Sequence, residues 1–368
     1  MTTFEPARVR PGDRSLPARY YLSATVFEEE RRRLFGNQWL CLGRTLSTSP
    51  GEYFLAEVDG ESLLVVRDDA GRLRAFYNVC RHRGTRLVQA PRGRLTGGIA
   101  CPYHAWRYRL DGRLATAPHM EEVPDFHPGA YGLHPAAVSE WEGLAWLTLD
   151  PRPTPFETVY APLIGRFADW NLPALSAVQR IAYDVRANWK LVFENYNECY
   201  HCSPLHPRLV QLSPADSGRN DFLEGPFLGG YMTLRSGMHL TASGRACAGR
   251  TLGRVAGADL ERAYYYTFFP NVLFSLHPHY AMVHTLWPVA ADRTRIVCEW
   301  FFDPQAPESN PEDAVSFWDE VNRQDWQASE WTQQGMTSRV FSPGPYSQRE
   351  GLSAAFDRYY LQAMGEDG

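Results

Sequence analysis

The chain has 368 residues, of which 44% are hydrophobic, and a formal net charge of −5 at pH 7. This length permits two domains with separate cores, and the lack of a long basic run argues against a nucleic-acid partner. No stretch approaches the ~18 consecutive apolar residues of a membrane-spanning helix, and the N-terminus lacks the apolar core of a signal peptide. A cytoplasmic protein without a membrane partner is therefore expected.

A short helix is predicted at residues 27–35. Glutamates lie near its start and arginines near its end, the distribution that the helix macrodipole favours. We expect residues 1–37 to form a helical N-terminal segment that packs with the second domain.

Strand patterns begin at about residue 38. Alternating runs are separated by turn sequences such as Asp59-Gly60. The predicted strands are residues 53–58, 62–67, 73–78, 107–110 and 113–115. Residues 38–150 are therefore expected to form an all-β domain, and the proline-rich stretch Pro151–Pro155 is predicted to be a linker.

Four potential metal ligands lie in two motifs of this domain. Cys80 and His82 form a Cys-x-His motif, and after eighteen residues Cys101 and His104 form a Cys-x-x-His motif. Two thiolates on one iron and two imidazoles on the other are the ligands of a Rieske [2Fe–2S] centre, an electron relay. A zinc site uses the same donors but usually pairs Cys with Cys and His with His, whereas each motif here carries one of each. The spacing therefore favours the Rieske centre.

Beyond the linker, residues 151–368 are predicted to form a domain with a central antiparallel sheet and flanking helices, so that the fold class is α+β. The predicted strands are residues 181–186, 264–269, 272–276, 282–288 and 295–302. A helix is predicted to start at Asn310, because Asn is a common N-cap, Pro311 suits the first helical position, and acidic residues follow.

Two further histidines, His201 and His206, lie five residues apart. On a continuous helix they would point in different directions, so the helix is expected to end between them, where Pro204 stands. Both imidazoles could then face one metal. The ordinary alternative is that they are surface or core histidines in a chain that has eleven.

Asp325 is the best candidate for a third ligand. It falls on one stripe of the predicted helix with Trp318 and Val321, and a carboxylate on an apolar stripe is costly unless it is paired or metal-bound. Asp319, Glu320 and Glu330 remain alternatives, because the phase of the helix is uncertain. Two His and one carboxylate leave positions open for O2 and substrate, as in non-haem Fe(II) oxygenases. An upstream electron relay favours this interpretation, because such an oxygenase needs a one-electron donor.

On these motifs the chain resembles the catalytic α subunits of the Rieske non-haem iron oxygenases over nearly its whole length. The resemblance implies these ligands: Cys80, His82, Cys101 and His104 for the [2Fe–2S] cluster, and His201, His206 and Asp325 for the mononuclear iron. In the aromatic-ring dioxygenases of this family, an Asp three residues before the first iron-binding His bridges to the cluster His of a neighbouring subunit. Glu198 stands at that place here, and Asn195 precedes it by three residues rather than four.

Glu198 as the bridge is similar to the branch that oxidises N-methyl groups of quaternary ammonium compounds such as glycine betaine, proline betaine and carnitine. A solvated helix carboxylate is the alternative for Glu198, and Glu194 is an equally plausible surface acid by spacing alone. The resemblance implies a monooxygenase that hydroxylates an N-methyl group with O2 and so releases formaldehyde. Two alternatives stay open: a ring-hydroxylating or O-demethylating oxygenase of aromatic substrates, and a Rieske electron carrier without a second metal.

The resemblance also implies partners. Electrons in this family cross a subunit boundary, so a head-to-tail ring is expected, and we predict a homotrimer. No Gly-x-Gly-x-x-Gly fingerprint follows a predicted strand. A separate flavin- or ferredoxin-type NAD(P)H reductase is therefore expected.

Pocket residues cannot be chosen from the sequence. Aromatic residues are dense on the predicted strands: Tyr264, Tyr265, Tyr266, Phe268, Phe269, Phe274, Tyr280 and Trp287. Ring faces bind quaternary ammonium groups, although aromatic residues on strands usually belong to the core. Arg235, His277 and His279 are candidate partners for a substrate carboxylate.

The chain has seven cysteines, of which two are assigned to the cluster. The remaining five are Cys41, Cys199, Cys202, Cys247 and Cys298. Most are expected to be reduced, buried thiols, because an iron–sulfur protein belongs in a reducing compartment.

Overall fold

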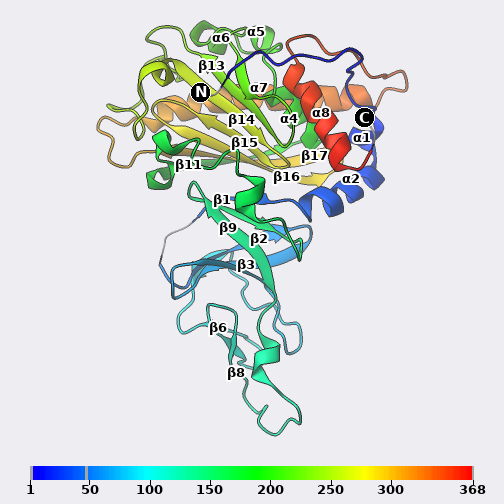
Figure 1. Ribbon diagram of the computed structural model, residues 1–368, viewed down its shortest axis with the longest axis vertical. Coiled ribbons are helices and arrows are strands. Elements are labelled where there is room, and N and C mark those ends of the chain that lie inside the picture. Colours follow the sequence, from blue (N-terminus) through cyan, green and yellow to red (C-terminus); the bar gives the residue numbers. More distant parts are fainter. Residues whose placement is uncertain (1–2, 46–48, 367–368) are drawn as a thin grey trace. The chain divides into compact units, whose positions relative to one another are not determined.

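The computed structural model describes residues 3–45 and 49–366 (Figure 1). The chain divides into two compact units. The inserted unit runs from Arg31 to Ala161, and the split unit combines residues up to Glu30 with residues from Pro162 onward. Their large sheets are antiparallel, so the predicted α+β class is confirmed. In the described ranges, no helix has both the length and the apolar character of a membrane crossing.

The inserted unit contains two sheets, with strand orders β1-β10-β9-β4-β3-β2-β5 and β6-β7-β8. The bounds are β1 (Leu40–Arg44), β2 (Glu52–Val58), β3 (Glu61–Arg67), β4 (Leu73–Tyr77), β5 (Arg92–Arg94), β6 (Ile99–Ala100), β7 (Arg107–Tyr108), β8 (Leu114–Thr116), β9 (Pro135–Trp141), β10 (Leu144–Thr148) and a short α3 (Phe156–Val159). The strands predicted from the alternating runs correspond to β2, β3, β4, β7 and β8. The alternation does not reveal β10, because all five of its residues are buried.

The helix predicted at residues 27–35 is present, but its second half is π-helical. Helix α1 spans Arg19–Leu22 and α2 spans Ala24–Glu30, after which Arg31–Phe35 is π-helical. A hydrogen bond from the Gly36 N–H to the Arg31 carbonyl (2.8 Å) closes the wider turn, because it reaches back five residues instead of four.

The split unit is built on a seven-stranded sheet in the order β11-β17-β16-β15-β14-β13-β12. The bounds are β11 (Ser176–Val185), β12 (Arg219–Phe222), β13 (Phe227–Thr233), β14 (Arg262–Phe268), β15 (Val272–Leu276), β16 (Ala281–Ala290) and β17 (Arg293–Phe302). The five predicted strands correspond to β11 and to β14 through β17. Strands β12 and β13 lack a strand-like sequence, because β12 is polar and Gly229 and Gly230 interrupt β13.

Three helices of the split unit lie together against this sheet: α4 (Trp189–Tyr196), α7 (Pro311–Met336) and α8 (Gly351–Ala363) (Figure 1). Two short helices, α5 (Cys202–Leu205) and α6 (Pro207–Leu212), follow α4. Helix α7 starts where predicted, but the Asn310 side chain makes no capping hydrogen bond. Asn188 does cap α4, because its side chain accepts the Lys190 N–H.

A buried ion pair joins the two parts of the split unit. Lys190 Nζ of α4 lies 2.5 Å from Glu30 Oε1 of α2, and both side chains are 0% exposed. Trp189 Nε1–H donates to the same carboxylate (2.9 Å), as does the Tyr360 hydroxyl of α8 (2.6 Å). The carboxylate is therefore well hydrogen-bonded, as a buried charge must be.

Candidate metal centres and cavity

The two Cys-His motifs fold into matched loops. In the first loop, the Gly84 N–H donates to the Cys80 carbonyl (3.0 Å), and in the second, the Ala105 N–H donates to the Cys101 carbonyl (3.2 Å). Gly84 and Ala105 have positive φ angles, +75° and +56°. Each loop thus turns back on its cysteine within four residues.

The four predicted cluster ligands converge at these loops. Cys80 and Cys101 are both buried, and burial, together with interaction with Cys101, raises the pKa of the Cys80 thiol. His82 Nδ1 lies 3.1 Å from His104 Nδ1 on the more exposed side. A paired set of two sulfur and two nitrogen donors fits a [2Fe–2S] cluster with mixed ligands.

Tyr108 supports this site and was not predicted from the sequence. Its hydroxyl lies 3.3 Å from Cys80 Sγ and accepts the Arg81 N–H (3.0 Å). Trp106, also in the core of the unit, stacks on the His82 ring at 4.9 Å. The hairpin that contains Tyr108 was predicted, but a strand pattern does not reveal where a hydroxyl points.

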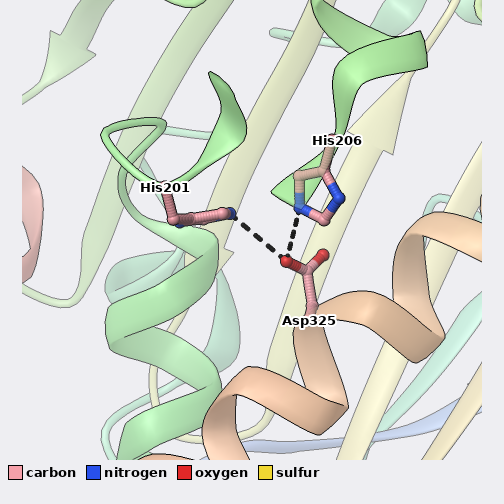
Figure 2. Close-up of side chains that lie close together, drawn as sticks. All are labelled: His201, His206 and Asp325. Atoms are coloured by element: carbon pink, nitrogen blue, oxygen red, sulfur yellow. Dashed lines mark hydrogen bonds and ion pairs between the residues drawn. The ribbon is translucent and has the colours of Figure 1, made fainter. Parts of the chain in front are cut away.

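The split unit brings His201, His206 and Asp325 together (Figure 2). Asp325 Oδ1 lies 3.2 Å from His201 Nε2 and 2.8 Å from His206 Nε2. One donor atom from each residue lies within 4.8 Å of the others, which is compact enough to hold one metal ion. Trp318 and Val321 are buried on the same stripe of α7 as predicted, and the alternative acids Asp319, Glu320 and Glu330 are not in this group.

The outer nitrogens of both imidazoles are held by oxygen acceptors. His201 Nδ1 lies 2.5 Å from Glu198 Oε1, and His206 Nδ1 lies 2.6 Å from Gln324 Oε1. An oxygen acceptor at Nδ1 fixes the proton there and leaves the Nε2 lone pair for the metal. The donor set therefore fits a mononuclear iron site. Gln324 was missed in the sequence, although it directly precedes Asp325.

The charges of this site are strongly coupled. Burial alone lowers the pKa of His201, but hydrogen bonds to Asp325 and Glu198 outweigh burial and raise this pKa to about 10. Burial alone raises the pKa of Asp325, but hydrogen bonds from His201 and His206 outweigh it and lower this pKa to about 2. In the metal-free protein a proton thus takes the place of a cation among these ligands.

The helix break differs from the prediction. Helix α4 already ends at Tyr196, so Glu198 and His201 lie beyond it rather than on one helical face. Pro204 lies inside the short α5, and His206 stands before α6. Glu198 reaches His201 because the chain folds back: its Oε2 accepts the backbone N–H groups of Tyr200 and of His201 (3.2 Å).

Two of the five remaining cysteines are not free thiols. Cys199 and Cys202 form a disulfide across the segment that carries His201. Among the described residues, Cys41, Cys247 and Cys298 are buried and form no disulfide, so most of the five are reduced thiols as predicted. The Cα atoms of Cys199 and Cys202 lie 4.9 Å apart, within the usual range for a disulfide.

Glu194 is not a surface acid. It accepts a hydrogen bond from the Tyr21 hydroxyl (2.6 Å), and its charge, after burial, helps to raise the pKa of Asp357. Burial raises its pKa to about 7, against the opposing effects of Tyr21 and Lys190. Glu194 therefore keeps its proton to a higher pH in the folded protein than an exposed glutamate does.

A cavity of about 260 Å³ opens at the His201, His206 and Asp325 group. Aromatic rings form part of its lining: Tyr196, Tyr231, Tyr265, Trp318 and Trp326. Of the eight aromatic residues considered in the sequence, only Tyr265 is among the lining residues. Six of the others are buried in the core, and Trp287 is half-buried.

The predicted carboxylate partners Arg235, His277 and His279 do not line this cavity. His277 is buried in the core, stacked on Tyr280 at 4.2 Å. Two other arginines, Arg219 and Arg349, do line it. These residues lie in β12 and just before α8, two segments whose positions in space could not be inferred from sequence.

Two protein-family models and a known protein match this chain. A family model described as "Ring hydroxylating alpha subunit (catalytic domain)" matches residues 172–366, and a "Rieske [2Fe-2S] domain" model matches residues 38–127. A glycine betaine monooxygenase oxygenase subunit from Chromohalobacter salexigens is 31% identical over 385 residues, which cover 94% of this chain and 84% of that protein.

Two solved structures are similar across most of the chain. The quaternary ammonium Rieske monooxygenase CntA in complex with L-carnitine has a TM-score of 0.80 at 26% identity, covering 95% of this chain and 96% of that one. Naphthalene 1,2-dioxygenase from Rhodococcus has a TM-score of 0.78 at 21% identity, covering 95% and 94%. At 21% identity, the similarity to naphthalene 1,2-dioxygenase shows only that the fold is shared.

Proposed function

The chain belongs to the family of ring-hydroxylating α subunits with a Rieske domain, and on this premise we propose that it hydroxylates an N-methyl group of a quaternary ammonium compound similar to glycine betaine. Members of this family are oxygenases that carry a [2Fe–2S] cluster and a mononuclear non-haem iron and use O2. The substrate class is what the proposal adds.

The observation that carries the proposal is the aromatic lining of the cavity beside the candidate iron ligands. A quaternary ammonium has no N–H to donate, so ring faces are its natural recognition element. Tyr196, Tyr265 and Trp318 line this cavity. Tyr265 lies 6.1 Å from Tyr196 and 6.2 Å from Trp318, between ring centroids. The relatives named for glycine betaine and carnitine support the same class.

If the substrate also carries a negative group, arginine side chains in the lining of the same cavity can bind that group. Arg219 and Arg349 line it, and neither guanidinium forms an ion pair within residues 3–45 and 49–366. By contrast, Arg10 and Arg358 nearby are both paired with carboxylates. We therefore favour a zwitterion, a trimethylammonium carboxylate, over a simple cation.

We assign the metal ligands as the sequence predicts: Cys80, His82, Cys101 and His104 for the cluster, and His201, His206 and Asp325 for the iron. The bound iron supplies O2 activation with electrons from the cluster. Glu198 and Gln324 orient the two imidazoles, and the aromatic rings hold the ammonium group. The overall reaction consumes the N-methyl compound, O2, two electrons and two protons and yields the N-hydroxymethyl product and water. This product then releases formaldehyde, leaving the demethylated amine.

The test is a reconstitution with a partner NAD(P)H reductase, because we propose that this chain does not itself oxidise NADH. Trimethylammonium carboxylates are expected to drive O2 consumption with formaldehyde formed in a one-to-one ratio. Hydroxylated products from aromatic acids, without formaldehyde, would instead support the aromatic alternative. Turnover with NADH and the purified chain alone would contradict the need for a reductase.

Iron analysis separates the oxygenase from a simple electron carrier. An oxygenase binds roughly three irons per chain, whereas a carrier with only a Rieske centre binds two. Loss of one iron in the variant His206→Ala, with an unchanged cluster spectrum, is expected.

Glu198 is proposed to bridge His201 to the cluster of a neighbouring subunit in a homotrimer. The variant Glu198→Gln keeps the size of the side chain and loses its charge. It should retain the cluster spectrum and iron while steady-state turnover is abolished. Glu198→Asp should restore part of the turnover only if its shorter side chain still spans the subunit interface. Glu312→Gln, an exposed acid at the start of α7, is the matched control.

Wild-type turnover in Glu198→Gln at full metal loading would show that electrons take another route. Sedimentation tests the assembly directly. A monomer that is catalytically competent would contradict the proposed ring.

A further inference from the structure

The N-terminal strap, residues 4–15, runs along the cavity of the split unit. Pro6 and Ala7 line the cavity. Next to them, Glu5 and Asn220 of β12 exchange both backbone hydrogen bonds, at 2.8 and 2.7 Å. Because β12 is the edge strand of the sheet, the strap pairs with an edge that would otherwise be open. Strand β12 itself contributes Arg219 and Asn220 to the cavity.

The other side of the strap is pressed against the start of α8. A Cβ atom at Gly351 would lie 2.6 Å from the Ala7 carbonyl carbon and 2.7 Å from the Arg8 nitrogen. Both are backbone atoms, so a side chain at Gly351 cannot be accommodated unless the strap moves. Leu352, the next residue of α8, lines the cavity. The strap therefore fills the space between β12 and α8.

Ion pairs hold the far end of the strap. Arg358 of α8 lies 2.5 Å from Asp13 of the strap and 2.9 Å from Glu224. Glu224 also pairs with Arg10 of the strap (2.8 Å). The Arg358 and Asp13 side chains are mostly buried, so this contact is stronger than an ordinary surface pair. The strap is thus fixed on both sides of Pro6 and Ala7.

We propose that this strap is a specificity-determining wall of the cavity, where Pro6 and Ala7 limit the length of the substrate. The inference rests on the proposed function for the chemical class of the substrate. The cavity, at about 260 Å³, is smaller than the ~300–1,000 Å³ of sites for drug-sized ligands, which suits a molecule of few heavy atoms. With the N-methyl group at the iron site, a longer substrate would press on the strap.

The variant Gly351→Ala tests the strap from the side of α8, because its new methyl group must displace the backbone of Ala7 and Arg8. Alanine is also the better helix former, so the variant should keep α8. The matched control is Gly335→Ala in α7, where a Cβ meets nothing within 4 Å. Ala7→Leu tests the strap from the side of the cavity, because a larger side chain at this position reduces the space for substrate.

Binding is measured by calorimetry on the iron-free protein. The value of kcat/KM is measured on the reconstituted enzyme. The probes are trimethylammonium carboxylates with one to four methylene groups between nitrogen and carboxylate. Gly351→Ala is expected to raise the preference for the longest over the shortest probe about tenfold, and Ala7→Leu to lower it by a similar factor. Gly335→Ala should match the wild type.

An equal change at every chain length, or none, in both strap variants would overturn the proposal. If the wild type binds none of these probes but oxidises aromatic acids, the proposed function is wrong. The same comparison with para-alkylbenzoates of increasing length then tests the strap by itself. Binding of neither series would contradict both proposals.

Discussion

Ala105 occupies the backbone conformation that Gly84 occupies in the matching loop. A left-handed conformation costs an L-residue roughly 1–2 kcal/mol, of which a glycine is largely relieved. We predict that Ala105→Gly raises the free energy of unfolding of the inserted unit by up to about 1 kcal/mol. Urea unfolding followed by the absorbance of the cluster measures it.

Gly84→Ala provides the opposite test. A Cβ at Gly84 would meet nothing closer than the Val79 side chain at 4.0 Å, so only the positive φ opposes the change. The variant should be destabilised by a similar amount. Equal stability of both variants and the wild type would show that backbone strain is absent from the two loops.

The raised pKa of Glu194 makes the split unit sensitive to pH. The folded state holds a proton on this acid up to about pH 7, whereas an unfolded glutamate loses it near pH 4.5. Stability from Glu194 is therefore present below the unfolded pKa and is lost as the pH rises through the folded pKa. Asp357, whose pKa burial also raises, acts in the same direction.

Glu194→Gln keeps the side chain neutral at every pH. We expect the melting temperature of the variant to exceed that of the wild type by a margin that grows between pH 5 and pH 7.5. Over this range the wild type must either keep a proton on Glu194 or bury its negative charge, whereas the variant has no charge at this position. Each pKa unit corresponds to about 1.4 kcal/mol, so a gain of several degrees is expected. A difference between the two proteins that does not vary with pH would contradict the assignment.

At the scale of elements, α7 supplies both Asp325 and the acceptor that orients His206. Replacing Gln324 by Met removes the hydrogen bond at His206 Nδ1 and leaves the three proposed iron ligands in place. Loss of such a partner typically lowers metal affinity about 10–100-fold. Titration of the metal-free protein with Fe(II) should show this loss, whereas Gln327→Met, on the exposed face of α7, should bind iron like the wild type.

Elements with a local signature could be predicted, and those that depend on distant contacts could not. Strands β14 to β17 follow apolar runs between turns, and α7 begins at an Asn-Pro-acid sequence. Strand β12 has the sequence Arg-Asn-Asp-Phe, which becomes a strand only because β13 and Glu5 pair with it. The local sequence of β12 does not predict such pairing.

The site shows the same division. His201, His206 and Asp325 were predicted because ligand spacing and an apolar stripe are local features. The cavity residues were not, because they come from the N-terminus, β12, β13, β14 and α8, far apart in the chain. Arg235 was chosen as a carboxylate partner, yet Arg219 and Arg349 line the cavity.

At the scale of the whole molecule, Glu30 and Lys190 link chain segments 160 residues apart. Replacing Glu30 by Met leaves a buried ammonium without its partner, a change that typically costs about 3–5 kcal/mol. We expect loss of mononuclear iron and a lower melting temperature for the split unit. The absorbance of the cluster should persist, since its proposed ligands belong to the inserted unit.

The double variant Glu30→Met/Lys190→Met is the control for this prediction. It removes both charges and should recover much of the lost stability, because a buried ion pair is often replaceable by apolar residues of similar volume. If the double variant is as unstable as Glu30→Met, packing or the Trp189 and Tyr360 hydrogen bonds, rather than charge, must account for the loss.

The split of one unit around the other also sets an order for biosynthesis. A ribosome adds roughly 5–20 residues per second, so Glu30 emerges roughly 10–30 s before Lys190 and longer still before Tyr360 of α8. The inserted unit needs no later segment, and its four proposed ligands are complete once His104 has emerged. The strap and α2, in contrast, must wait for α8. A nascent chain can therefore acquire its cluster before the split unit is complete enough to retain iron, so that iron delivery follows cluster assembly.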